Sequence, residues 1–204
     1  MPPMKSFFLA SVVTLMTVST AACQQPPVPP PQVKANPNPQ HKYEVVMTVR
    51  NAPRAFEQVA GSAQFDIPAE QDACIPLDQT RALAGVRNRP SETVPLRFRK
   101  VSDTEYRAEF FADALLDEDY YGLGVCHWKL TAIGATLTAQ PAVFSTETWN
   151  EAIFSGAQQV TFAPKSLFAL SPDPIEFHPM TLAGERAPSA EDFEVVFQSR
   201  KIEQ

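Results

Sequence analysis

The residues best suited to binding another molecule form one short run in the second half of the chain. The run consists of Asp117, Glu118, Asp119, Tyr120 and Tyr121. Carboxylates attract a cation or a basic protein surface, and tyrosines bury a large area for little lost freedom. The run is therefore predicted to be a partner-binding loop, held in place by the nearby Cys126. The alternative is a solvated acidic turn whose tyrosines cover the end of the fold.

The side chains that catalysis would need do not form a recognisable arrangement. The chain has no Gly-x-Ser-x-Gly motif, no phosphate-binding glycine loop, no zinc spacing and no EF-hand loop. Its three histidines are scattered: His41 ends a proline-rich stretch, His127 falls on the polar side of an alternating run, and His178 precedes a proline. We therefore predict no cofactor, no bound metal and no enzymatic activity. A hydrolase built from two converging carboxylates is kept as an alternative.

The charge balance argues against a nucleic-acid partner. The 204 residues include 17 Lys and Arg against 23 Asp and Glu, which gives a formal charge of −6. Phosphate binding requires a basic face, and an acidic chain favours a basic protein partner instead.

The N-terminal residues are predicted to be an export signal. Lys5 supplies a positive charge, and the 16 residues at positions 7–22 that follow are uncharged and end in small side chains. This order is typical of a secretory signal peptide, and the stretch is short for a permanent membrane span. Removing residues 1–22 takes away Lys5 and no acidic residue, which leaves 16 basic and 23 acidic residues and a charge of −7.

The segment Ser19-Thr20-Ala21-Ala22-Cys23 resembles the lipobox of bacterial lipoproteins. The resemblance implies that Cys23 is acylated and becomes the mature N-terminus, so the protein would be held at a lipid bilayer. Gln24 after the cysteine implies sorting to the outer membrane of a Gram-negative cell, with the domain facing the periplasm. The alternative is an ordinary cleaved signal peptide with an incidental cysteine.

Residues 24–40 are predicted to be a tether. This stretch is rich in proline, which fixes φ and removes amide donors, so neither a helix nor an internal strand fits. Such a sequence favours an extended polyproline II spacer.

The two remaining cysteines are predicted to form one disulfide. Cys74 and Cys126 are not part of a Cys-x-x-Cys motif, and an exported chain favours their pairing.

The rest of the chain is predicted to be mainly β. Apolar and polar residues alternate in six runs, near positions 43–50, 62–67, 94–99, 105–110, 126–130 and 193–198. Alternation indicates strands with one buried face, which is typical of antiparallel sheets. We expect a single antiparallel β-sandwich of about seven or eight strands. It would be similar to immunoglobulin-like sandwiches in architecture only, since Trp128 follows the second cysteine and the family's Cys–Trp–Cys order is absent.

Few helices are expected. Thr148 and Glu151 have capping-box spacing, with Gly156 ending the helix, and Asp78 is predicted to cap a short helix that ends near Gly85. Residues 163–190 contain five prolines and are predicted to be an irregular connection with one helical turn near 166–170, while residues 102–104 are predicted to be a hairpin turn.

These features define three segments: a lipoprotein signal peptide at 1–22, a lipidated cysteine with a proline-rich linker at 23–42, and a β-sandwich domain at 43–204. The function that they favour is a non-catalytic binding module of the cell envelope, such as an inhibitor or immunity protein against an envelope-targeting toxin or lysozyme. The alternatives are an accessory subunit of an envelope or secretion complex and the hydrolase above.

Overall fold

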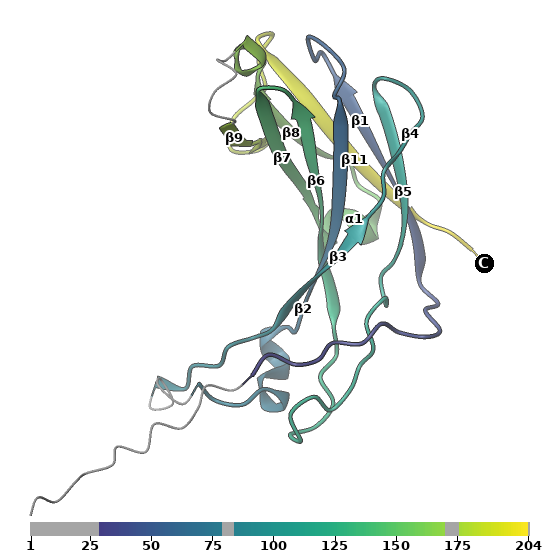
Figure 1. Cartoon of the computed structure of the whole chain (residues 1–204), viewed down its shortest axis with the longest axis vertical. Helices are drawn as coiled ribbons and strands as arrows, with labels where there is room; N and C mark the ends of the chain where they lie inside the picture. The colour runs from purple at the N-terminus through teal and green to yellow at the C-terminus, as the bar shows by residue number, and fades with distance from the viewer. Residues whose placement is uncertain (1–28, 79–83, 170–175, 204) are drawn as a thin grey trace, which may run out of the picture.

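The computed structural model describes residues 29–78, 84–169 and 176–203. Two sheets dominate it and pack face to face as a β-sandwich (Figure 1). In spatial order, the six-stranded sheet consists of β10 (Thr181–Leu182), β8 (Gln159–Pro164), β11 (Asp192–Lys201), β1 (Lys42–Arg50), β5 (Glu105–Phe111) and β4 (Arg99–Lys100). The five-stranded sheet consists of β3 (Ser91–Leu96), β2 (Gln58–Asp66), β6 (Lys129–Ala139), β7 (Ala142–Trp149) and β9 (Glu176–Pro179).

The mainly β prediction is confirmed, but the expected number of strands was too low. The described residues contain eleven strands, and one pair, β7 with β9, is parallel. The additional strands β9 and β10 lie inside residues 163–190, which were predicted to be irregular; the helical turn expected there is present as a 3₁₀ helix, η3 (Lys165–Ala169).

The core lies between the two sheets and follows the alternating pattern of the sequence. Val45, Met47 and Val49 of β1 are at most 3% exposed and point inward. Leu137 of β6 and Phe197 of β11 belong to the same buried cluster, so the two sheets share one core. Burial of these side chains is the main force that holds the sheets together.

Aromatic rings close one end of the core. Phe56, Phe144, Phe168 and Phe193 come from a loop, β7, η3 and β11, and their ring centroids lie 4.9 to 6.0 Å apart. The hairpin that joins β6 to β7 lies at the top of Figure 1.

Two crossings between the sheets show how local sequence directs the chain. Residues 97–98 connect β3 in one sheet to β4 in the other. Phe98 packs so closely on Gly61 of β2 that a Cβ atom at position 61 would come within 2.8 Å of the Phe98 ring. The predicted hairpin turn at 102–104 then joins β4 to β5, with the Ser102 N–H donating to the Glu105 carbonyl at 3.2 Å.

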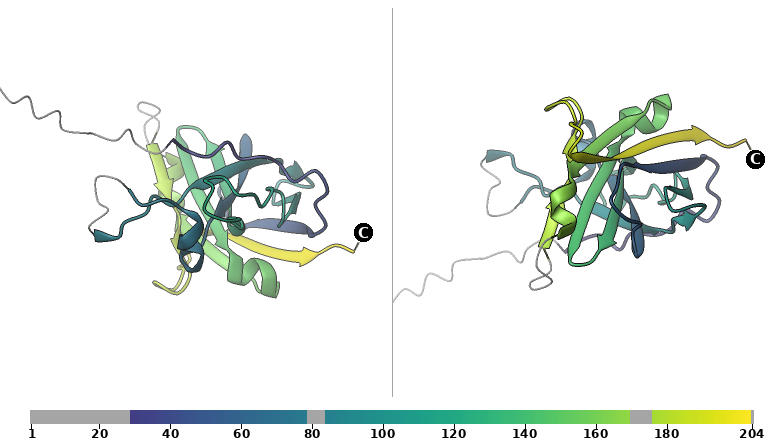
Figure 2. Two further views of the ribbon diagram at one scale, coloured as in Figure 1. Left: turned by 90° about the horizontal axis from the view of Figure 1, so that it is seen from below. Right: turned by 90° about the horizontal axis from the view of Figure 1, so that it is seen from above.

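The second crossing is the helix α1 (Asn150–Ser155), which joins β7 to β8 on one side of the sandwich (Figure 2). It ends at Gly156, whose φ of 71° is left-handed as predicted. The predicted capping box is wrong: Thr148 belongs to β7, is 2% exposed and faces the core, and no side chain caps the helix. The helix predicted after Asp78 lies largely outside the described residues. A second 3₁₀ helix, η1 (Ala69–Cys74), was not expected.

The chain before position 43 also packs on the sandwich. The Leu116 N–H donates to the Lys34 carbonyl at 2.9 Å, and the Asn36 N–H donates to the Ala114 carbonyl at 2.8 Å. Residues 33–41, here called the strap, therefore run along residues 111–116 and lie within the folded unit rather than within a free spacer.

Candidate binding site

The disulfide predicted from the sequence is present and fixes one end of the sandwich. Cys74 ends η1, Cys126 precedes β6, and their Cα atoms are 5.4 Å apart. Both residues are at most 5% exposed. The bridge therefore ties the long connection between β5 and β6 to the segment that follows β2.

The acidic run 117–119 lies in this connection, and each of its carboxylates is engaged within the molecule. Asp117 accepts the Trp128 N–H at 2.9 Å and contacts His127 Nδ1 at 2.7 Å. Glu118 forms an ion pair with Lys34 at 2.8 Å, and Asp119 accepts the Leu123 N–H at 3.0 Å. The three acids therefore stabilise the conformation of the loop, and they do not form a set of free carboxylates that could bind a cation.

The two tyrosines of the run are partly buried and pack against the core cluster. The Tyr120 hydroxyl donates to the Leu116 carbonyl four residues upstream, and Trp128 Nε1 donates to the Tyr120 oxygen at 3.3 Å. The rings of Tyr120 and Trp128 meet edge to face at 6.1 Å. Burial raises the pKa of Tyr121 above its ordinary value.

The side chains that the loop does present were not selected by sequence reasoning. Leu123 and Val125 are both 50% exposed, and they alternate with Gly122 and Gly124, which have φ values of 71° and 111°. Positive φ values turn the chain so that the two apolar side chains stand at the tip. Cys126 closes the loop, because its N–H donates to the Glu118 carbonyl at 3.0 Å. Two large apolar residues set between glycines were the available signal.

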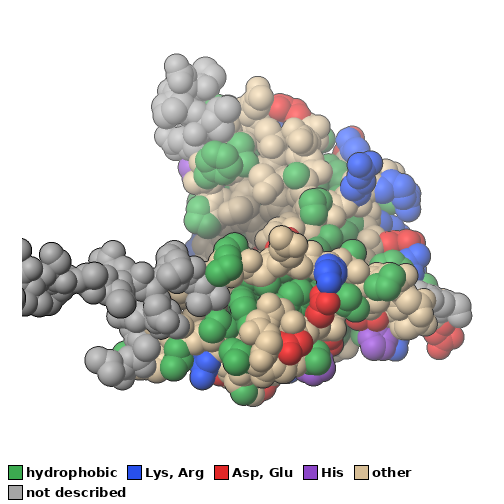
Figure 3. Space-filling model, turned by 60° about the horizontal axis from the view of Figure 1, so that its bottom comes forward, with side chains coloured by type: hydrophobic (Ala, Val, Ile, Leu, Met, Phe, Trp, Pro, Cys, Tyr) green, Lys and Arg blue, Asp and Glu red, His purple; other side chains and the backbone are tan. Residues whose placement is uncertain are grey.

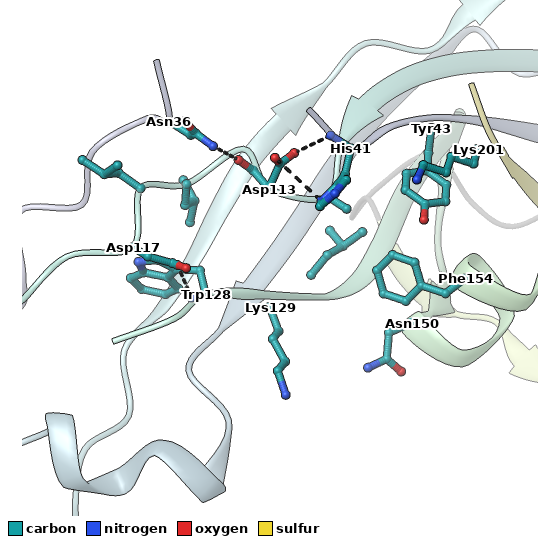
Figure 4. A pocket seen from close by; sticks show the side chains of 14 residues that line it. Asn36, His41, Tyr43, Asp113, Asp117, Trp128, Lys129, Asn150, Phe154 and Lys201 are labelled. Carbon is teal, nitrogen blue, oxygen red and sulfur yellow. Dashed lines mark hydrogen bonds and ion pairs between the residues drawn. The ribbon is translucent and has the colours of Figure 1, made fainter. Parts of the chain in front are cut away.

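A groove of about 640 Å³ opens beside the loop (Figure 4). Its wall on one side comes from Leu115, Leu116 and Trp128 at the base of the loop. The other side is aromatic: the half-exposed Phe154 of α1 meets Tyr43 of β1 edge to face at 5.6 Å. Its volume lies within the range of small-molecule sites, and its lining is both polar and apolar.

The strap is fixed at the rim of the groove by the Asp113 carboxylate, which lies in the connection between β5 and β6. Asp113 accepts the N–H groups of Gln40 at 2.8 Å and His41 at 2.9 Å, and Figure 4 shows it turned toward His41. Burial raises the pKa of Asp113, but the two backbone N–H groups outweigh this effect, so its pKa lies below the ordinary value. His41 is therefore held in position, which the sequence did not indicate.

The remaining polar residues of the sequence analysis lie apart from this site or on the surface. The side chain of His127 is 58% exposed and paired with Asp117, as expected for a surface position. His178 lies on β9, with its ring 5.9 Å from that of Phe144. Within the described ranges, no group of three or more His, Cys, Asp or Glu side chains is arranged to hold a metal ion.

Seen from the loop end, the surface mixes hydrophobic side chains with acidic and basic ones (Figure 3). Among the helices that the structure describes, none is long and apolar enough to cross a membrane. Comparisons of the chain with protein-family models, with curated proteins and with solved structures found no match.

Proposed function

We propose that this protein is a lipid-anchored, non-catalytic binding module of a Gram-negative envelope, which captures a protein partner with its disulfide-pinned end. In its most specific form, the module is an inhibitor or immunity protein against an envelope-targeting toxin or lysozyme. The lipobox-like segment supports anchoring through Cys23 to the outer membrane, and the Cys74–Cys126 bridge is of the kind that persists outside the cytoplasm.

The observation that carries the proposal is the construction of the loop at 117–126. Its three carboxylates are engaged within the molecule, its base is held by the disulfide, and two apolar side chains stand exposed at its tip. A loop that is ordered before binding loses little conformational entropy on association. An apolar tip on a fixed base fills a pocket on the partner, while the adjacent groove receives a segment that surrounds this contact.

A photo-crosslinking experiment tests the proposal. A photoreactive residue is placed at Leu123 in the full-length chain, produced in a Gram-negative host, and crosslinked species are identified by mass spectrometry. Val101 serves as the matched control, since it is 47% exposed and lies in the turn between β4 and β5. We expect one dominant partner from position 123 and none from position 101. The same products from both positions would reject a specific site at the loop.

The mature protein also tests the anchor directly. Mass spectrometry is expected to show an acylated Cys23 at the N-terminus and fractionation with outer membranes, whereas Cys23→Ala is expected to abolish both. An unprocessed N-terminus in the wild-type protein would contradict the lipoprotein assignment. The crosslinking test of the loop does not depend on that outcome.

A further inference from the structure

β7 of the five-stranded sheet lies beside β8 of the six-stranded sheet. We call this contact between the two sheets the seam. Beyond β9, the edge of β7 is closed by a side chain. Gln159 Nε2 donates to the Glu147 carbonyl at 2.7 Å, and the Trp149 N–H donates to Gln159 Oε1 at 3.2 Å. The hydroxyl groups of Thr146 and Thr161 bond to each other across the seam. The Glu147 carbonyl and the Trp149 N–H of this edge are thereby satisfied by one side chain.

These side chains surround a groove of about 250 Å³. Trp149, which is 44% exposed, gives it an aromatic surface, and Met180 and Leu182 add apolar surface. Glu147 and Glu185 contribute two carboxylates from β7 and from the turn after β10. The groove thus combines an indole, apolar surface and two negative charges in one small volume.

Many acids in the described part of the chain have a basic partner, and the two carboxylates of the groove do not. Glu44, Asp72, Glu109 and Asp192 each pair with Lys or Arg. In the part of the chain that the structure describes, Glu147 and Glu185 form no ion pair with a Lys, Arg or His side chain. Two uncompensated charges beside apolar surface favour a cation supplied from outside.

The same molecule shows how such surroundings hold a cation. The Arg186 guanidinium lies 4.0 Å from the centre of the Phe162 ring and forms two hydrogen bonds to Asp192, at 2.9 and 3.0 Å. This pairing lowers the pKa of Asp192 below its ordinary range, with a further contribution from the Ser189 N–H. The seam groove offers groups of the same types, an aromatic ring and carboxylates, in a more exposed setting, and no Lys or Arg is among the described residues that line it.

We propose that the seam groove receives a Lys or Arg side chain of a basic polypeptide partner. The methylene stem would lie on Trp149 and Met180, and the charged head would reach Glu147 and Glu185. The net negative charge of the chain favours the same class of partner. The proposal specifies the chemistry of a partner but does not depend on the loop at 117–126.

Tryptophan fluorescence provides the test, because the chain has two tryptophans and Trp128 is only 8% exposed. The probe is a blocked tri-arginine peptide, titrated into the oxidised protein at low salt, with a blocked tri-glutamate peptide for comparison. We expect tri-arginine to shift the Trp149 emission and tri-glutamate to leave it unchanged. Binding is expected to weaken as salt is raised.

The double variant Glu147→Gln/Glu185→Gln is expected to weaken tri-arginine binding at least tenfold. Glu92→Gln is the matched control, since Glu92 lies on β3 at the opposite edge of the same sheet. Both variants should melt like the wild type. Equal affinities in the double variant and in the control would overturn the proposal.

Two further outcomes separate this proposal from others. Leu123→Asp must leave tri-arginine binding unchanged, so a failure of the loop proposal and a failure of this one can be told apart. Sedimentation measures whether a second copy of the chain supplies the cation, for example through Arg97 or Arg99, which are exposed. Self-association of the wild type that is lost in the double variant would overturn the assignment to a separate partner.

Discussion

Two acidic regions of this protein have opposite arrangements. In the loop at 117–119, three consecutive acids are all engaged, by a lysine, a histidine and two backbone N–H groups. In the seam groove, Glu147 and Glu185 stand 38 positions apart in the sequence, and the described residues supply no basic side chain to either.

The difference teaches that a high density of acids along a sequence does not indicate free carboxylates. A tight loop contains backbone N–H groups that no sheet partner accepts, and short acidic side chains satisfy them at small cost. In the seam, the N–H of Trp149 is already bonded to Gln159, so the outward-facing Glu147 of the same strand stays available. Availability is therefore a property of the surrounding backbone.

The largest change in stability is expected when the disulfide that holds the loop is removed. Cys74→Ser/Cys126→Ser is expected to lower the free energy of unfolding by about 4 kcal/mol, because the disulfide limits the unfolded chain over its separation of 52 residues. Urea unfolding of the variant, compared with the wild type in the presence and absence of reductant, measures the loss. Seam binding of tri-arginine should persist below the transition; its disappearance would show that the two regions are coupled.

A smaller effect is expected at Asp113, which joins the strap to the loop. The pKa of Asp113 is lowered in the folded protein, so its contribution is complete above the ordinary pKa of about 3.9 and is lost as the pH falls through the folded-state value. Asp113→Asn should cost roughly 1 to 2 kcal/mol at neutral pH and flatten the acid end of the stability curve. Chemical unfolding from pH 7 to pH 2 gives the comparison, and identical pH profiles would contradict the role of the carboxylate.

The smallest effect sets one acid of each region side by side. Asp117→Ala should destabilise the protein by about 1 kcal/mol, since the Trp128 N–H loses its acceptor. Glu147→Ala should change stability by less than about 0.5 kcal/mol, because it is exposed and without an ion pair in the described chain. Thermal melts measure both, and equal losses would remove the contrast between the regions.

The strands with one wet face were predictable from the sequence, and those covered on both sides were not. β5 buries alternate residues along its length, and β1 does so from Val45 to Val49. By contrast, β7 begins with three consecutive buried residues, Ala142, Val143 and Phe144, and alternation is present only from Phe144 to Trp149. β9 ends at Pro179 on the margin of its sheet, a position where proline is tolerated although it suggests a loop in the sequence.

The disulfide and the existence of the loop were predictable at the candidate site, but the role of each residue was not. The sequence shows that Asp117 and Tyr120 are polar and near Cys126, yet their bonds to Trp128 and Leu116 depend on how the chain turns back. The exposure of Leu123 follows from two glycines with positive φ, which composition does not reveal. The seam groove joins β7 to the turn after β10, and only the topology brings these together.

The strap limits the distance between the sandwich and its proposed attachment point at Cys23. Among the described residues, the first that packs on the core is Val33, ten positions after Cys23. If Cys23 is fixed in a bilayer, these ten residues span at most about 35 Å. The loop and its groove lie on the same side as the strap. The segment between Cys23 and the sandwich is thus short and joins the domain beside the groove. A bound partner would therefore be kept close to the lipid surface.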